Sequence, residues 1–307
     1  MEKSIGIFLF KDIFKTMVKY ILERCVNKVK IITNELINNF KIYLYEEERS
    51  GNTIEKYMRD IRLFREWLKK RSVEKSVVID YKKELCSRYA VKSVNSMLSS
   101  INAFFVFMGW YDLKVKTLKI QRRIFADKSK ELSKAEYERL LIAAKDKKNE
   151  RLYYLMQTIA STGLRVSEIK YVTCEAVRQG QAVIDCKGKI RQIFLPKKLC
   201  QMLKTYIKSR NIKSGSVFIT RSGKPLDRCA IWKMLKGLCE SIGVSKDKVF
   251  PHNFRHLFAR TFYSLQKDIV RLADILGHSS VETTRLYTME SGTEHIKQLQ
   301  KLGLLRC

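Results

Sequence analysis

The spacing of apolar residues predicts helices in the first third of the chain. From Thr53 to Lys70 the apolar positions recur every three or four residues, as on the buried face of a helix, and Ser50 stands where a helix start is expected. A second pattern of this kind runs from Ser93 to Met108. We therefore expect a compact helical domain over residues 31–111. Apolar residues at helical spacing in residues 1–30 predict a helical N-terminal extension, which we expect to pack on that domain.

Short polar side chains lie between the apolar positions of the second pattern. They are small enough to approach DNA closely, although a solvated helix face is the simpler interpretation. They are Lys92, Asn95, Ser96 and Ser99.

A basic stretch separates this domain from the rest of the chain. Residues 112–130 hold many more cations than anions, which is typical of a charged linker and also of a strap that crosses a phosphate backbone. The cations are Lys114, Lys116, Lys119, Arg122, Arg123, Lys128 and Lys130, against Asp112 and Asp127.

The remaining residues, 131–307, change in pattern. Ser133 and Glu136 have the spacing of a capping box at a helix start. A helical pattern runs from Arg151 to Ala160 and ends before Gly163, and residues 181–195 alternate in polarity around Gly188 as a β-hairpin does. The rest is mostly helical in pattern, so the expected fold class is mainly α with a small β-sheet.

The charge balance indicates the kind of partner. The chain has 307 residues, enough for two domains, with 61 Lys and Arg against 31 Asp and Glu, a formal net charge of +30. Such a chain attracts a polyanion, most commonly a nucleic-acid backbone, and the alternatives are a generally basic proteome or a membrane-surface protein. The eight cysteines show no C-x-x-C spacing, which favours reduced thiols in a cytosol over zinc sites or disulfides. The apolar run from Ile5 to Phe10 is too short for a signal peptide or a membrane span.

Six side chains in the second half carry candidate chemistry. Breaking a phosphodiester builds negative charge on the phosphoryl oxygens, and a guanidinium matches phosphate geometry with paired donors. Arg165 and Arg255 are the candidates for this role. Arg165 follows Thr162-Gly163, a tight turn at a helix start where backbone N–H groups also face anions. Arg255 lies in the motif Pro251-His252-Asn253-Phe254-Arg255-His256.

The other four groups suit proton transfer and attack. Lys187, at the hairpin tip, is placed to protonate a departing 5′ oxygen, and Lys189 competes for that role. The phenol of Tyr287 suits the nucleophile, with His252 as the group that accepts its proton. His278, in Leu276-Gly277-His278-Ser279-Ser280, is suited to donate a hydrogen bond to the phosphate.

A metal site fits this half poorly. His252 and His256 are four residues apart, as in H-E-x-x-H, but Asn253 stands where that motif has its general base, and no third ligand follows at the required spacing. His256 is instead expected to be a structural partner behind the site.

These motifs resemble the tyrosine recombinase, or phage integrase, family, and especially its Xer-like members and the integrases of mobile elements. The resemblance spans about Asn34 to Leu305 and implies a SAM-like helical core-binding domain followed by a mixed α/β catalytic domain. It implies Tyr287 as the nucleophile of a 3′-phosphotyrosyl link, Arg165 and Arg255 on the scissile phosphate, and Lys187 as general acid.

The same resemblance implies His252 as general base, His278 as transition-state donor, and Glu168 as an acid that orients an arginine or His252. No metal, ATP or other cofactor is implied. The sequence departs from the family pattern at Phe254, usually leucine, and in the hairpin turn, which leaves the choice between Lys187 and Lys189 open.

For the whole protein the resemblance implies a clamp around duplex DNA in a prokaryotic cytoplasm, at the nucleoid and away from membranes. Four protomers would act on two sites through a Holliday junction, in integration, excision or resolution. A helical tail would dock on a neighbouring subunit through an apolar face comprising Ile296, Leu299, Leu302 and Leu305.

Two other functions compete with the site-specific recombinase. A type IB topoisomerase shares the chemistry without pairing two sites, and a non-catalytic DNA-binding accessory protein shares the fold. The two-domain length and the tail favour the recombinase over the topoisomerase. The intact set of six residues argues against the accessory protein.

Overall fold

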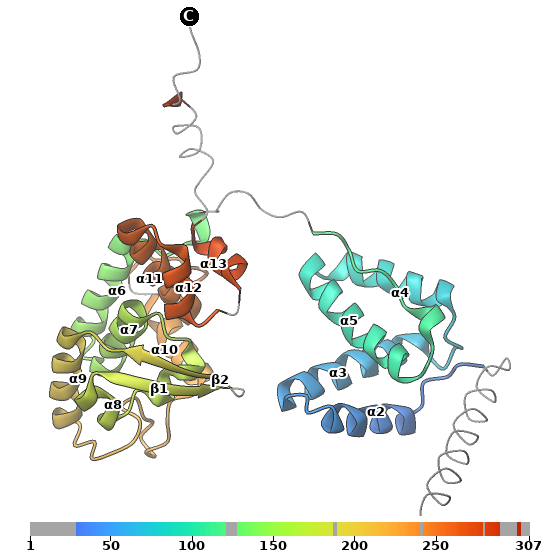
Figure 1. Ribbon diagram of the computed structural model, residues 1–307, viewed down its shortest axis with the longest axis horizontal. Coiled ribbons are helices and arrows are strands. Elements are labelled where there is room, and N and C mark those ends of the chain that lie inside the picture. The colour runs from blue at the N-terminus through green and yellow to red at the C-terminus, as the bar shows by residue number, and fades with distance from the viewer. Residues whose placement is uncertain are drawn as a thin grey trace, which may run out of the picture. The chain divides into compact units, whose positions relative to one another are not determined.

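The computed structural model describes residues 29–120, 128–186, 189–239, 242–278, 280–288 and 300–301. The chain divides into two compact units, Met1–Arg122 and Arg123–Cys307, each with its own hydrophobic core (Figure 1). Four predicted features lie outside the described residues: the N-terminal helix up to residue 28, residues 121–127 of the basic connector, the turn residue Lys187, and the apolar face of the tail.

Four helices build the first unit: α2 (Asn34–Glu46), α3 (Gly51–Leu68), α4 (Lys75–Arg88) and α5 (Val91–Phe107). The two helices predicted from apolar spacing are α3 and α5. Helix α3 begins directly after Ser50, which is its N-cap residue as predicted, and α5 begins two residues before Ser93. Their apolar faces meet in a core in which Phe40, Phe64 and Phe104 are fully buried. The prediction of a compact helical domain is confirmed.

The start of the predicted linker is attached to this unit. A 3-10 turn, η1 (Tyr111–Leu113), leads into Val115, and both Leu113 and Val115 are buried in the core. The amide of Asn102 brackets Val115, donating to its carbonyl at 2.8 Å and accepting from its N–H at 3.0 Å. Asn95 does the same to Leu118, at 2.9 and 2.7 Å. Asn95 thus fixes the connector, contrary to the expectation that it faces DNA or solvent.

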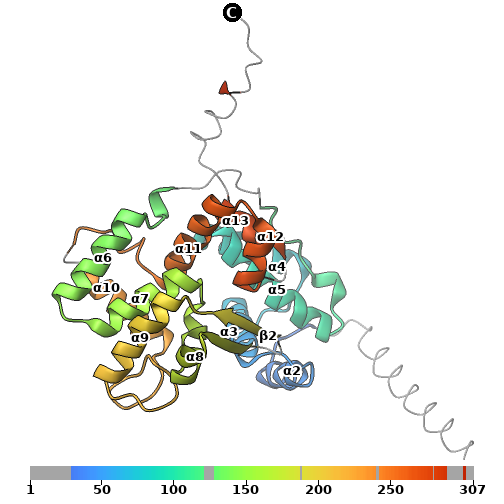
Figure 2. The ribbon, with the colours of Figure 1, turned by 60° about the vertical axis from the view of Figure 1, so that its left-hand side comes forward.

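The second unit contains most of the helices and the only sheet in the described part of the chain. Figures 1 and 2 show the hairpin beside α12, although the two are far apart in the sequence. The elements are η2 (Lys128–Lys130), α6 (Lys134–Asp146), α7 (Glu150–Thr162), η3 (Val166–Tyr171), α8 (Cys174–Gln179), β1 (Gln181–Cys186), β2 (Lys189–Phe194), α9 (Lys197–Ser209), α10 (Arg228–Cys239), α11 (Pro251–Gln266), α12 (Ile269–Leu276) and α13 (Val281–Thr288).

Local sequence signals fix several of these elements. The capping box is confirmed: the N–H of Glu136 donates to the Ser133 hydroxyl at 3.1 Å, and the Ser133 N–H donates to the Glu136 carboxylate at 2.8 Å. Helix α7 ends at Thr162, as the position of Gly163 predicts. The fold class, mainly α with a small antiparallel sheet, is confirmed.

The hairpin has an unusual distribution of polarity on its two faces. Antiparallel pairing places Ile184 opposite Arg191 and Ala182 opposite Ile193. Ala182, Ile184 and Ile193 are buried, so Arg191 belongs to the inward face. The outward face exposes three apolar side chains, Val183, Ile190 and Phe194. A charged residue turned inward in this way needs a partner, which the site provides.

Among the helices in the described ranges, none is both long and apolar enough to cross a membrane.

Candidate active site

The site begins where α7 ends. Gly163 closes the helix with a φ of +65°, the left-handed region that favours glycine. A Cβ there would lie 2.6 Å from Cδ1 of Phe258 on α11, so the close approach of the two helices also requires glycine. The Gly163 carbonyl accepts a hydrogen bond from Nη1 of Arg255 at 2.6 Å. The turn therefore joins α7 to the arginine of α11.

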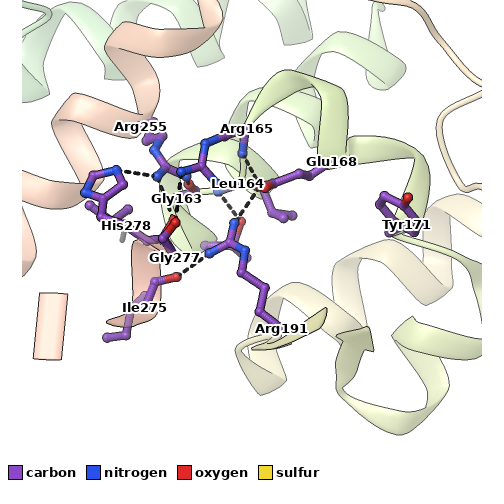
Figure 3. Close-up of polar contacts among 12 residues, drawn as sticks. Gly163, Leu164, Arg165, Glu168, Tyr171, Arg191, Arg255, Ile275, Gly277 and His278 are labelled. Carbon is purple, nitrogen blue, oxygen red and sulfur yellow. Dashed lines mark hydrogen bonds and ion pairs between the residues drawn. The ribbon is translucent and has the colours of Figure 1, made fainter. Parts of the chain in front are cut away.

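Glu168 holds Arg165 at the start of η3. Its carboxylate accepts the Arg165 backbone N–H at 2.8 Å and Nη1 of the same residue at 2.9 Å (Figure 3). Nη2 of Arg165 donates to the Gly277 carbonyl at 3.1 Å. The sequence predicted that backbone N–H groups at this turn face an anion. In the structure the N–H of Arg165 donates to the Glu168 carboxylate, which reaches back three residues to the start of η3, and this N–H therefore does not face a bound anion. The Glu168 side chain is 3% exposed and that of Arg165 is 39% exposed.

Arg255, on α11, is 1% exposed and held entirely by neighbouring elements. Besides the Gly163 carbonyl, it donates from Nη2 to the Leu276 carbonyl at 2.8 Å and to Nε2 of His278 at 2.9 Å. Desolvation, and next the charge of Arg165, lower the pKa of Arg255 to about 10. The guanidinium remains charged at neutral pH.

His278 follows Gly277, which caps α12 with a φ of +63°. A guanidinium has only donors, so Nε2 of His278 accepts from Arg255 and the ring proton resides on Nδ1. Nδ1 then donates to the hydroxyl of Thr284, a buried residue of α13, at 2.8 Å. Desolvation first, and then the charges of Arg255, Arg165 and Arg191, lower the pKa of His278 to about 4. The ring is neutral at neutral pH.

Tyr287, on α13, lies among three imidazoles. Its ring centroid is 4.5 Å from that of His256, 5.7 Å from that of His278, which it stacks on, and 6.4 Å from that of His252. Tyr287 is only 6% exposed. His252 and His256 meet edge to face at 4.4 Å.

The two histidines of α11 are also neutral at neutral pH. Desolvation and the charges of Arg255 and Arg165 lower the pKa of His252. Desolvation, followed by His252 and Arg255, lowers that of His256 to about 4. A neutral imidazole beside a phenol is able to accept its proton.

The structure thus brings five of the six predicted residues together: Arg165, His252, Arg255, His278 and Tyr287. Lys187 lies outside the described residues, and Lys189 begins β2. Among the described residues, no group of three His, Cys, Asp or Glu side chains is close enough together to hold a metal ion.

Two contributors escaped the sequence analysis. Arg191, on β2, donates to the Glu168 carboxylate at 2.6 Å and to the Ile275 carbonyl at 2.8 Å (Figure 3). The sequence could have indicated this, because Arg191 is two residues from the apolar Ile193 and so lies on the same, inward face of the strand. Thr284 gave a weaker signal, its helical spacing of three residues from Tyr287.

Comparison with known proteins agrees with this geometry. The profile described as "Phage integrase family" matches residues 130–294, more than half of the chain, and that of the "Phage integrase, N-terminal SAM-like domain" matches residues 37–111. The chain is 29% identical to a tyrosine recombinase XerA of Thermococcus kodakarensis over 285 residues, covering 89% of this chain and 96% of that protein. It is 28% identical to a tyrosine recombinase XerD of Staphylococcus saprophyticus, covering 83% and 93%.

Solved structures share the fold. The integrase of transposon Tn1549 bound to transposon right-end DNA superimposes with a TM-score of 0.69 at 16% identity, covering 88% of this chain and 99% of that one. A XerH recombinase bound to its difH substrate gives a TM-score of 0.63 at 20% identity, covering 79% and 78%.

Proposed function

Because this chain belongs to the phage integrase family, we propose that it is a site-specific DNA recombinase that cleaves and rejoins duplex DNA through Tyr287. The observation that carries the proposal is the position of Tyr287. The phenol lies against the imidazoles of His256 and His278. Arg255 is hydrogen-bonded to His278, and Arg165 lies near enough for its charge to lower the pKa of Arg255. Cations for a phosphate and neutral bases for a phenol therefore converge on one tyrosine.

In the cleavage step one phosphorus–oxygen bond replaces another. The Tyr287 oxygen attacks phosphorus, the bond from phosphorus to the 5′ oxygen breaks, and a 3′-phosphotyrosyl link forms. His252 takes the phenolic proton, and Lys187 or Lys189 gives a proton to the departing 5′ oxygen. Arg165 and Arg255 bind the phosphoryl oxygens as their charge grows. Rejoining is the reverse reaction with a 5′ hydroxyl from the partner strand, so no ATP, metal or other cofactor enters the reaction.

His278 has to change its hydrogen bonds to take part. It stabilises the transition state by donating from Nε2, the atom that accepts from Arg255 in the structure. When Arg255 turns to the phosphate, Nε2 becomes free to carry the proton. The Thr284 hydroxyl is able to donate as well as accept, so it holds the ring in either tautomer.

The substrate we propose is double-stranded DNA in the cytoplasm of a prokaryote. The net charge of +30 supports a polyanionic partner. Structures of the similar XerH recombinase and Tn1549 integrase hold their DNA substrates. We assign the exchange of strands to four protomers on two sites, passing through a Holliday junction.

A tail contact is part of this proposal. The apolar residues Ile296, Leu299, Leu302 and Leu305 recur at helical spacing after the nucleophile and suit a contact with a neighbouring subunit. Charges introduced by Leu299→Glu and Leu302→Glu together are expected to leave binding to a single site intact and to abolish assembly on two sites, measured by mass photometry. Unchanged assembly would refute the tail contact alone.

Covalent-adduct formation tests the function. The protein is incubated, with EDTA present, with nicked suicide duplexes that carry the site from its own genomic locus, and the adduct is resolved on a denaturing gel. We expect a 3′-linked adduct from wild type and from the matched control Tyr263→Phe, and none from Tyr287→Phe. Absence of a wild-type adduct would refute the catalytic proposal and favour the accessory protein. Adduct with relaxation of supercoils but no strand exchange would favour the topoisomerase.

The same assay decides the general acid. A 5′-bridging phosphorothiolate has a thiolate leaving group, which departs without a proton because thiols are far more acidic than alcohols. Lys187→Ala is expected to lose cleavage of the ordinary substrate and regain it on the sulfur substrate, whereas Lys189→Ala changes neither strongly. The reverse pattern would assign the role to Lys189.

A further inference from the structure

Arg191 and Arg165 share one buried carboxylate. Oε1 of Glu168 accepts from Nη1 of Arg165 at 2.9 Å, and Oε2 accepts from Nη2 of Arg191 at 2.6 Å (Figure 3). Oε2 also accepts the backbone N–H of Arg165 at 2.8 Å. The Arg191 side chain is 17% exposed, much less than that of Arg165. The cluster therefore consists of one exposed cation, one buried anion and one shielded cation.

The second arginine is not required to satisfy the carboxylate. Arg165 alone provides Glu168 with a charge-assisted pair and a backbone donor, and buried ion networks are weak sources of stability because desolvation offsets their attraction. Arg191 changes the charge instead. With it the cluster carries a net charge of +1, and without it Arg165 and Glu168 form a neutral pair.

A neutral pair is poor at binding a phosphate. The charge of Glu168, at hydrogen-bond distance from the Arg165 guanidinium, opposes the attraction that Arg165 exerts on an anion. The carboxylate that orients Arg165 therefore also weakens the attraction of Arg165 for a phosphate. A second cation on the far side of the carboxylate removes that conflict.

The surrounding backbone is shaped to keep Arg191 in this position. Its Nη1 donates to the Ile275 carbonyl in the last turn of α12. A Cβ on Gly277 would lie 2.6 Å from Cδ and 2.7 Å from Nη1 of Arg191. Glycine at position 277 thus leaves room for the guanidinium, and the same residue accepts from Arg165 through its carbonyl.

We propose that Arg191 is a positioning residue that neutralises Glu168, so that Glu168 orients Arg165 without cancelling the positive charge that Arg165 presents to the scissile phosphate. This inference rests on the proposed function, since it concerns the phosphate site of the same reaction.

Charge-conserving and charge-removing variants test the proposal. Single-turnover adduct formation is measured at saturating protein on the nicked substrate, at a temperature well below the melting point of each variant. Arg191→Met is expected to slow cleavage about 10- to 100-fold, the effect of losing one charge-assisted phosphate interaction. Arg191→Lys keeps the charge and is expected to retain a rate within about 10-fold of wild type. Arg178→Met, in an exposed ion pair with Glu175, is the matched control and is expected to cleave as wild type does.

A compensating variant separates charge from packing. Arg191→Met combined with Glu168→Gln restores the net charge of +1 on Arg165 and leaves no unbalanced buried carboxylate, so the double variant is expected to fold and to cleave several-fold faster than Arg191→Met alone. The proposal would be overturned if the double variant cleaved no faster than Arg191→Met alone. It would also be overturned if Arg191→Lys cleaved no faster than Arg191→Met. A wild-type protein that forms no adduct would instead refute the proposed function, which the same gels show separately.

Discussion

At the scale of single residues, hydrogen bonds determine which nitrogen of His278 carries the proton. His278 accepts at Nε2 and donates at Nδ1 because its neighbours are a guanidinium and a hydroxyl. Arg255 therefore decides where the proton lies, and the Thr284 hydroxyl holds the ring in place by accepting from Nδ1.

The variant Thr284→Val tests whether the Thr284 hydroxyl holds the His278 ring in place. The substitution keeps the shape of the side chain and leaves Nδ1–H of His278 without its acceptor, which costs roughly 1–3 kcal/mol when buried. We expect adduct formation to slow about 10-fold, with the DNA affinity unchanged. The adjacent Thr283 is exposed and serves as the control, so Thr283→Val is expected to cleave as wild type does. Equal rates in the two variants would mean that Thr284 does not fix the ring.

The low pKa values of His256 and His278 predict a pH dependence of stability. Both lie near 4 in the folded protein, whereas the unfolded chain has the ordinary value of about 6.5. Between these values the unfolded state binds more protons, so the free energy of unfolding falls as pH is lowered from about 7 to about 4. The fall is roughly 1–3 kcal/mol for His256 and smaller for His278, which solvent screens more. In the His256→Asn variant, the free energy of unfolding, measured with urea across this pH range, should fall less than in wild type. A fall as large as that of wild type would contradict the assignment to His256.

Residues that take part in the chemistry could be predicted from the sequence, whereas a residue that acts through a tertiary contact could not. Arg165, His252, Arg255, His278 and Tyr287 were predicted because their types and order carry the reaction. The role of Arg191 was not, because strand alternation shows that a side chain turns inward but not which carboxylate it meets. That partner, Glu168, lies in another element, and only the tertiary structure brings the two together.

At the scale of elements, two helices end on glycines with different surroundings. Gly163 ends α7 with φ of +65° and Gly180 ends α8 with φ of +75°. A Cβ at Gly163 would meet Phe258 at 2.6 Å, whereas nothing lies within 4 Å of one at Gly180. The two positions share the backbone strain and differ in packing.

Alanine at each position separates the two effects. Gly180→Ala is expected to lower the free energy of unfolding by about 1–2 kcal/mol, the strain of a left-handed residue. Gly163→Ala is expected to lower it by about 2–4 kcal/mol, because overpacking against α11 adds to the strain. Chemical denaturation of both variants measures the difference. Equal losses would show that α11 yields to a Cβ at position 163 without cost.

Elements were predicted well where a local signal exists. Helices α3, α5 and α7, the capping box of α6 and the hairpin all follow from periodicity, caps or glycines. The 3-10 form of η3 and the attachment of the connector to α5 were not predicted. The start of η3 is closed by Glu168, which accepts the backbone N–H of Arg165 three residues earlier. The connector is held by Asn95 and Asn102, whose side chains bind the backbone of a distant segment.

At the scale of the whole molecule, charge is the dominant property. Most of the net +30 lies outside the few groups that the site requires. Such charge binds phosphates without regard to sequence and releases counterions from DNA when it does so.

Salt dependence of DNA binding measures this charge. We expect the affinity for duplex DNA, followed by fluorescence anisotropy, to fall roughly 10³- to 10⁵-fold between about 50 and 200 mM salt, as for a protein that contacts six to ten phosphates. Tyr287→Phe should give the same slope, since the nucleophile does not carry the charge. A flat curve would mean that the excess of cations does not contact the backbone.

The enclosure of Tyr287 has a consequence for the cell that holds this protein. A side chain able to nick DNA, if freely accessible, would endanger every phosphodiester that a strongly basic protein touches while it searches a chromosome. Here Tyr287 as a residue is only 6% exposed, and it packs against the rings of His256 on α11 and of His278 just after α12. We therefore expect cleavage to require a rearrangement around Tyr287 that follows DNA binding, so that the search along DNA and the cutting of a strand are separate steps.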